Sequence, residues 1–161
     1  MDDTNIVAPF AHPAMKSARN QTIQATTKTE WKKTWLNDKA TGEHLRGITQ
    51  ALHIKDGPTL YNTMANRMHM AWLARLRTGH VSLNAYLHDH GHMDNPQCEC
   101  GAGAETVSHY LLRCATYDEE RDKLRKEVGF GSMRVGRLLG DPKNVKRTLD
   151  FVTRTQRFTF E

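Results

Sequence analysis

The placement of the cysteines constrains this chain more than any other feature of its sequence. All three cysteines of the 161-residue chain fall between positions 98 and 114, and a histidine lies between the last two. The four residues Cys98, Cys100, His109 and Cys114 follow the spacing C-x-C-x8-H-x4-C. Three thiolates and one imidazole are a standard tetrahedral ligand set for structural zinc. The pattern therefore predicts a closed Cys3His site for Zn²⁺, which stabilises a fold and activates no water.

The spacing of the last two ligands predicts the local structure that holds them. A helix that begins at Glu105 or Thr106 would carry His109. On an unbroken helix, at about 100° per residue, His109 and Cys114 would point about 140° apart. We therefore expect the helix to end near Arg113, so that Cys114 can turn back toward the metal.

Two other states of the cysteines stay open at this point. Free cysteine is among the most buried residue types, so the three thiols could be ordinary core residues. A disulfide is the other alternative, but a bridge within C-x-C is strained, and an odd number of cysteines leaves one thiol unpaired. Zinc is the interpretation that uses all four residues.

Length and composition indicate a small domain with a modest core. The hydrophobic fraction is 38% and the mean hydropathy is −0.68. Structural zinc binds with about 10–16 kcal/mol in zinc-finger peptides, and a typical domain has a net stability of about 5–15 kcal/mol. We therefore expect the stability of this chain to depend on its metal.

The charge of the chain is consistent with a polyanionic partner. The net charge is +5 and the pI is about 9.2, with positive charge concentrated in residues 16–39 and 143–157. Solvated helix faces would also account for these runs. If nucleic acid is the partner, basic side chains contact its phosphates. The candidates for that contact are Lys32, Lys33, Arg113, Lys146 and Arg147.

Apolar residues at helical spacing predict a mainly α fold, a small helical domain with a zinc-knuckle-like CCHC loop. The expected segments are a weakly ordered stretch (1–27), a helical subdomain (28–95), the knuckle with the helix after it (96–128) and a C-terminal helical tail (129–161). The first expected helix begins at about Lys28, and the next three span His44 to Leu52, Pro58 to Gly79, and Ser82 to His88. A further helix is expected from a capping box at Thr116 to Gly129. The last two are expected from Ser132 to Leu139 and from Pro142 onward.

Other chemistry-bearing patterns are weak. His88, His90 and His92 could bind a metal, but a surface loop that contains several histidines is more common. No glycine-rich phosphate loop, strand-borne carboxylate pair or serine elbow is present in the sequence. The sequence also lacks a signal-peptide pattern and a stretch of about 18 apolar residues. We expect an intracellular protein, nuclear or cytoplasmic, that has no membrane partner.

A longer series of residues follows a recognisable order along the chain. It consists of Trp31, Trp35, Gly42, Leu45, Arg77-Thr78-Gly79-His80, Leu83, Tyr86-Leu87, the four metal-ligand candidates, Gly101, Glu105-Thr106, Leu111-Leu112, Tyr117, Arg121, Leu138-Leu139-Gly140-Asp141-Pro142 and Arg157-Phe158. In these residues the chain resembles the C-terminal region of non-LTR (LINE-type) retrotransposon reverse transcriptases, especially the fungal versions. The resemblance covers roughly residues 28–158.

The resemblance implies a CCHC zinc knuckle that follows the polymerase and helps to grip template RNA or target DNA during target-primed reverse transcription. Its ligands carry over onto Cys98, Cys100, His109 and Cys114. The polymerase motif Tyr/Phe-x-Asp-Asp and the carboxylate sets of the endonuclease and RNase H are absent from this sequence. The resemblance therefore implies a region that is not an enzyme by itself.

Three functions compete at this point. The first is a zinc-dependent module that binds RNA or DNA, in which Tyr110 or Tyr117 stacks on a base if it is exposed rather than packed against the knuckle. The second is a co-opted protein-interaction module that binds the parent reverse transcriptase or a host protein. The third is a retrotransposon remnant without a selected function.

Overall fold

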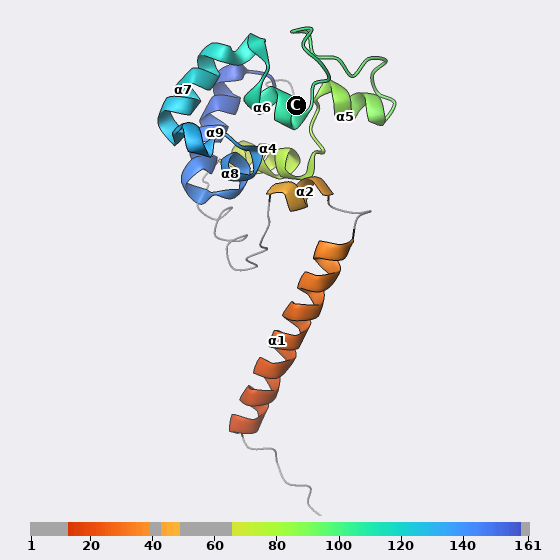
Figure 1. Cartoon of the computed structure of the whole chain (residues 1–161), viewed down its shortest axis with the longest axis vertical. Helices are drawn as coiled ribbons and strands as arrows, with labels where there is room; N and C mark the ends of the chain where they lie inside the picture. Colours follow the sequence, from red (N-terminus) through yellow and green to blue (C-terminus); the bar gives the residue numbers. More distant parts are fainter. Residues whose placement is uncertain (1–12, 39–42, 49–65, 159–161) are drawn as a thin grey trace, which may run out of the picture. The chain divides into compact units, whose positions relative to one another are not determined.

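The computed structural model describes residues 13–38, 43–48 and 66–158 of the chain (Figure 1). Within these ranges the structure is helical, apart from turns, loops and one isolated β-bridge, which confirms the mainly α fold class. The chain divides into two compact units, Met1–Lys39 and Ala40–Glu161. The predicted division of the chain into four segments stays a prediction; these segments are 1–27, 28–95, 96–128 and 129–161.

The first unit contains one long helix, α1, which spans Pro13–Asn37. The predicted start near Lys28 is wrong, because residues 13–27, expected to be weakly ordered, already belong to the helix. Every side chain from residue 17 to residue 34 is exposed, so the first half of α1 has no apolar stripe that could mark it as a helix. Trp31 and Trp35 stack on each other, with their ring centroids 5.8 Å apart.

The second unit consists of short helices around one apolar core. The helices are α2 (Glu43–Ile48), α4 (Arg67–Thr78), α5 (Asn84–Asp89), α6 (Val107–Leu112), α7 (Asp118–Val128), α8 (Val135–Gly140) and α9 (Pro142–Thr155), with 3-10 turns η1 (Ala115–Tyr117) and η2 (Phe130–Ser132) (Figure 1). Helix α9 packs against α4, α7 and α8. None of the described helices combines the length and the apolarity that a membrane crossing requires.

Helix α9 forms as its sequence predicts. Pro142 occupies the first turn, and the Asp141 carboxylate caps the helix by accepting the Lys143 N–H at 3.0 Å. The three side chains predicted to face inward, Val145, Leu149 and Val152, are buried in the core.

The starts of three other helices differ from the prediction. Asn66 caps α4 through its side chain, so the helix expected from Pro58 begins at Arg67, while residues 58–65 lie outside the described part. The expected caps Thr116 and Ser132 lie inside the 3-10 turns η1 and η2. These turns delay the start of α7 by one residue and the start of α8 by two, which a search for capping residues does not detect. Residues 49–52 of the helix expected from His44 also lie outside the described residues.

Helix α8 approaches α2 closely because two of its residues are glycines. A Cβ atom on Gly136 would lie 3.1 Å from the carbonyl oxygen of Gly47, and one on Gly140 would lie 3.2 Å from that of Ile48. A side chain at either position would therefore push the two helices apart. On its other side, α2 is held to α4 by a hydrogen bond of 3.0 Å between His44 Nε2 and the Leu76 carbonyl.

Candidate metal centre

The first two ligands lie in a tight turn that a single antiparallel β-bridge closes. The N–H of Gly101 donates to the Cys98 carbonyl at 2.9 Å, and the N–H of Cys98 donates to the Gly103 carbonyl at 2.8 Å. Gly101 has φ 75° and Gly103 has φ 135°, a backbone region that side-chain-bearing residues rarely adopt. The turn therefore depends on both glycines to bring Cys98 and Cys100 to one side.

The other two ligands come from helix α6 and from the residues directly after it. Thr106 caps the helix, since its hydroxyl accepts the His109 N–H at 3.1 Å. The helix ends at Leu112, and Cys114 has the extended backbone angles φ −60° and ψ 119°. This confirms the expected break near Arg113, which allows Cys114 to turn back toward His109.

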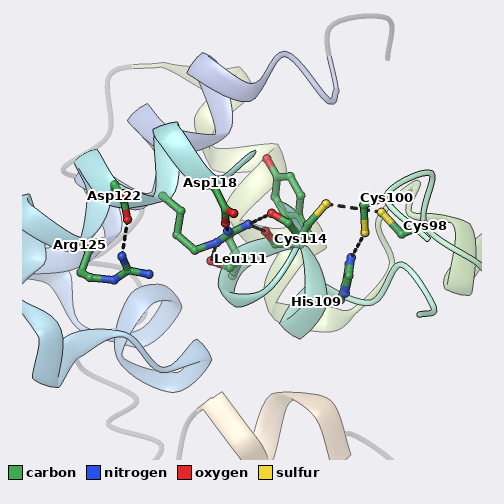
Figure 2. A network of polar contacts seen from close by, with 10 residues as sticks. Cys98, Cys100, His109, Leu111, Cys114, Asp118, Asp122 and Arg125 are labelled. Atoms are coloured by element: carbon green, nitrogen blue, oxygen red, sulfur yellow. Dashed lines mark hydrogen bonds and ion pairs between the residues drawn. The ribbon is translucent and has the colours of Figure 1, made fainter. Parts of the chain in front are cut away.

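The four side chains converge, as Figure 2 shows. Their donor atoms all lie within 4.8 Å of one another, the Sγ atoms of Cys98 and Cys114 are 3.5 Å apart, and Cys100 Sγ lies 3.3 Å from His109 Nε2. A zinc tetrahedron with Zn–S of about 2.3 Å and Zn–N of about 2.0–2.1 Å has ligand–ligand edges of about 3.5–3.8 Å. The residues therefore fit a tetrahedral metal ion after small movements.

The geometry also bears on the alternatives for the cysteines. All three are free, and the separation of 3.5 Å between Cys98 and Cys114 far exceeds a disulfide bond of about 2.05 Å. Cys98, His109 and Cys114 are buried, and Cys100 is partly exposed. Isolated core thiols need no imidazole beside them, whereas a metal site needs all four groups at this distance.

The thiols differ in how readily they lose a proton. Burial raises the pKa of the Cys98 thiol to about 12 in the metal-free protein, whereas the backbone N–H of Ala102 lowers the pKa of Cys100. Cys98 therefore keeps its proton at neutral pH until a cation binds beside it.

Zinc affinity is expected to rise with pH across the whole range from about 5.5 to 8.5. Because the pKa of Cys98 lies near 12 without metal, each binding event must release at least this one proton. The logarithm of the association constant should then increase by about one or more per pH unit. Competition with a chromophoric chelator, corrected for the chelator's own protonation, measures this slope, and a flat profile would contradict Cys98 as a ligand.

Arg121 is a residue of the site for which the sequence analysis predicted no role. Its side chain is 2% exposed, and its guanidinium donates to the carbonyls of Leu111, Tyr110 and Cys114 at the end of α6. It also pairs with Asp118, drawn with Leu111 and Cys114 in Figure 2. Helix-terminal carbonyls have no partner within the helix, so Arg121 satisfies them and fixes the backbone of Cys114.

A sequence signal for Arg121 does exist. It lies four residues after Tyr117, which directly precedes α7, and three before Leu124 of α7, and both of these residues contact the core. A charged residue on the inward stripe of a helix indicates a buried partner.

A second buried ion pair supports the turn from the other side. The carboxylate of Glu105, 5% exposed, accepts from Arg157 Nε at 2.9 Å and from Arg157 Nη2 at 2.7 Å, and it also accepts the Asn84 N–H at 2.9 Å. The hydrogen bonds with the Glu105 carboxylate raise the pKa of Arg157. This pair ties the segment after α9 to the start of α6.

The predicted phosphate-contacting residues are all exposed but belong to different parts of the chain. Lys32 and Lys33 lie on α1 in the first unit, Lys146 and Arg147 lie on α9, and Arg113 directly precedes the ligand Cys114. The four candidate metal ligands are the predicted site residues that the structure brings together.

Two other predicted features also have a structural outcome. His88, His90 and His92 are exposed and, among the described residues, do not form a group of converging metal donors.

Tyr110 is fully buried, with its hydroxyl oxygen 2.6 Å from that of Thr155. It is therefore packed in the core and not exposed, so its ring cannot stack on a base. Burial accordingly raises the pKa of Tyr110.

Curated proteins that match part of the chain belong to R1 retrotransposons. The retrovirus-related Pol polyprotein from type-1 retrotransposable element R1 2 of Nasonia vitripennis is 39% identical over 51 residues, which are 32% of this chain and 12% of that protein. The corresponding R1 polyprotein of Bradysia coprophila is 44% identical over 50 residues, 31% of this chain and 5% of that protein. The putative 115 kDa protein in type-1 retrotransposable element R1DM of Drosophila melanogaster is 39% identical over 61 residues, 38% of this chain and 6% of that protein.

The matched stretch is thus about a third of this chain and a small fraction of each relative. No known family profile matches the chain, and no solved structure does. The fungal version of the family stays a prediction. The similarities indicate a region of retrotransposon origin within this chain.

Proposed function

We propose that this chain is a zinc-dependent nucleic-acid-binding module, derived from a retrotransposon reverse transcriptase and not catalytic by itself. The observation that carries the proposal is the convergence of Cys98, Cys100, His109 and Cys114 within 4.8 Å. Three sulfurs and one nitrogen favour Zn²⁺ over hard cations, which prefer oxygen ligands. Four protein ligands leave no open coordination position, so the metal holds the fold together and activates no water.

The proposal of a nucleic-acid partner is supported by charge and by the relatives. The net charge of +5 favours a polyanion, and the relatives are named as Pol-type or other products of retrotransposons. Arg113, Lys146 and Arg147 are exposed cations of the second unit that can meet phosphates, and Lys32 and Lys33 are further candidates in the first unit. RNA and DNA are both consistent with these contacts, because phosphate recognition is shared between them.

Titration with single-stranded RNA and with duplex DNA at two salt concentrations tests this proposal. We expect micromolar binding at low salt that weakens steeply as salt increases, because bound counterions are released. Replacing both Lys146 and Arg147 with alanine should reduce the slope of log K against log[salt] by about 1.4–1.8.

The matched control removes two charges that already have acidic partners. Lys123 pairs with Glu120 and Arg125 pairs with Asp122 on α7. Lys123→Ala with Arg125→Ala changes the net charge equally but should leave the slope nearly unchanged. An equal loss in both double variants would show that net charge alone, and not the α9 residues, sets the affinity.

A protein partner is the second candidate, and one observation favours it. Three large apolar side chains of α1 are exposed to solvent: Ile23 is 51% exposed, Trp31 38% and Leu36 55%. Exposed large apolar side chains on one helix are typical of a surface that another protein covers. The absence of nucleic-acid binding at low salt would favour this candidate, with the parent reverse transcriptase or a host protein as the partner.

A further inference from the structure

A pocket of about 380 Å³ lies directly beside the metal centre. Cys98 and Glu99 of the metal-binding turn form one side of it, and Asn84, Tyr117 and Arg157 are among its other lining residues. Its volume falls at the lower end of the range of about 300–1,000 Å³ that small-molecule sites occupy. The pocket shares a wall with the metal site, so a bound metal would also fix the shape of the pocket.

An aromatic ring provides one wall of the pocket. Tyr117 is half-buried and packs edge-to-face against the core residue Tyr110, with their ring centroids 5.4 Å apart. Leu87 and Met93 also line the pocket, and Met93 is 40% exposed. A planar apolar ligand can therefore stack on a ring that is already held in place by the core.

The charged groups of the pocket, Arg157, Glu105 and Glu99, sum to one negative charge. Arg157 shares its Nε and Nη2 donors with Glu105 and Asn84, and its Nη1 makes no hydrogen bond to any residue in the described ranges. The exposed carboxylate of Glu99 adds an acceptor at the rim. Because Glu105 offsets the charge of Arg157 and Glu99 adds a negative charge, the pocket disfavours a phosphate and suits an uncharged ligand with both donors and acceptors.

We propose that this pocket takes one unpaired nucleobase, stacked on Tyr117 and contacted at its polar edge by Arg157 and Glu99. A base has the required flat apolar face and an edge of mixed donors and acceptors, and guanidinium donors are well suited to base acceptors. The inference rests on the proposed function and extends it, because the exposed cations recognise the backbone whereas the pocket recognises the base.

Binding of three labelled oligomers of about ten nucleotides tests the inference on the full, zinc-loaded chain. The probes are a mixed-sequence RNA, the same sequence as single-stranded DNA, and a fully abasic DNA of equal length. We expect the base-bearing oligomers to bind about tenfold more tightly than the abasic oligomer. The RNA and DNA arms show which nucleic acid supplies the base.

The variants Tyr117→Leu and Tyr117→Phe assign that difference to the pocket. Tyr117→Leu should lower the preference for base-bearing over abasic oligomers by about fivefold or more and leave the salt slope unchanged, whereas Tyr117→Phe keeps the ring and should keep the preference. Equal zinc content and equal helicity confirm that both variants are folded. If Tyr117→Leu does not fold, photocrosslinking of an iodouridine-bearing RNA to the unmodified chain replaces it, with the crosslink expected at Tyr117.

The possible results separate the two proposals. Equal affinity for abasic and base-bearing oligomers, an unchanged preference in folded Tyr117→Leu, or a crosslink elsewhere would overturn the nucleobase pocket and leave the proposed function standing. Absence of binding to all three oligomers at low salt would overturn the proposed function, and the pocket's assignment with it.

Discussion

Cys100→Ser is expected to abolish stoichiometric zinc binding and to lower the thermal midpoint of unfolding by more than about 10 °C. Structural zinc contributes folding free energy directly, and 1 kcal/mol corresponds to about 2–8 °C in a chain of this size class. Cys100 Sγ lies 3.3 Å from His109 Nε2, and the loss of this thiolate leaves an incomplete tetrahedron. Metal analysis of the reduced protein, with one zinc per chain expected for the wild type, and thermal unfolding with and without a chelator measure the effect.

A pair of histidine variants provides the matched control for this result. His109→Gln should behave like Cys100→Ser, because His109 supplies the nitrogen ligand. His92→Gln should keep its zinc, because His92 is exposed and lies outside the group of converging donors. Reduced wild-type protein that contains no zinc would remove the premise of the proposal.

Arg121→Met is expected to destabilise the second unit by about 3–5 kcal/mol and to weaken zinc binding at least tenfold. The substitution replaces the guanidinium with an apolar side chain of similar length, and it leaves three buried carbonyls at the end of α6 without their donor. An unsatisfied buried polar group costs about 1–3 kcal/mol, and the loss falls on the backbone that positions Cys114. Chemical unfolding and zinc competition measure the two effects.

Helix α7 contains a control with the same local geometry. Arg125 pairs with Asp122 three residues earlier, as Arg121 pairs with Asp118, but its side chain is 41% exposed against 2% for Arg121. Arg125→Met should therefore change stability by less than about 1 kcal/mol, as is usual for exposed ion pairs. Arg121→Lys should lie between the two, because one ammonium cannot reproduce the geometry of a guanidinium fork. Equal effects of Arg121→Met and Arg125→Met would contradict the positioning role.

Local patterns predicted those parts of the structure that local chemistry determines. The clustering of the four candidate ligands, the break of α6 before Cys114 and the cap of α9 at Asp141 each depend on a few neighbouring residues, and all three are found in the structure. The likeness to retrotransposon proteins agrees with the R1 relatives over the stretch that they match. The identity of the metal and of the partners stays a prediction.

Features that depend on tertiary contacts were not predictable from the sequence in the same way. The inward position of Arg121 indicates a buried partner, but only the tertiary structure identifies that partner as the carbonyls at the end of α6. The start of α4 at Arg67 is set by the side chain of Asn66 inside a run of apolar spacing that continues on both sides. Helix α1 has no buried stripe among its described side chains up to residue 34, so periodicity could not reveal its length.

The ion pair between Glu105 and Arg157 makes the far end of the chain a structural part of the metal-binding loop. These two residues are 52 positions apart, and the guanidinium is the cationic partner of a carboxylate that is only 5% exposed. Loss of Arg157 from the intact fold would leave that acid buried without its cationic partner, at a cost of several kcal/mol. We therefore expect the loop and the segment after α9 to unfold as one cooperative unit.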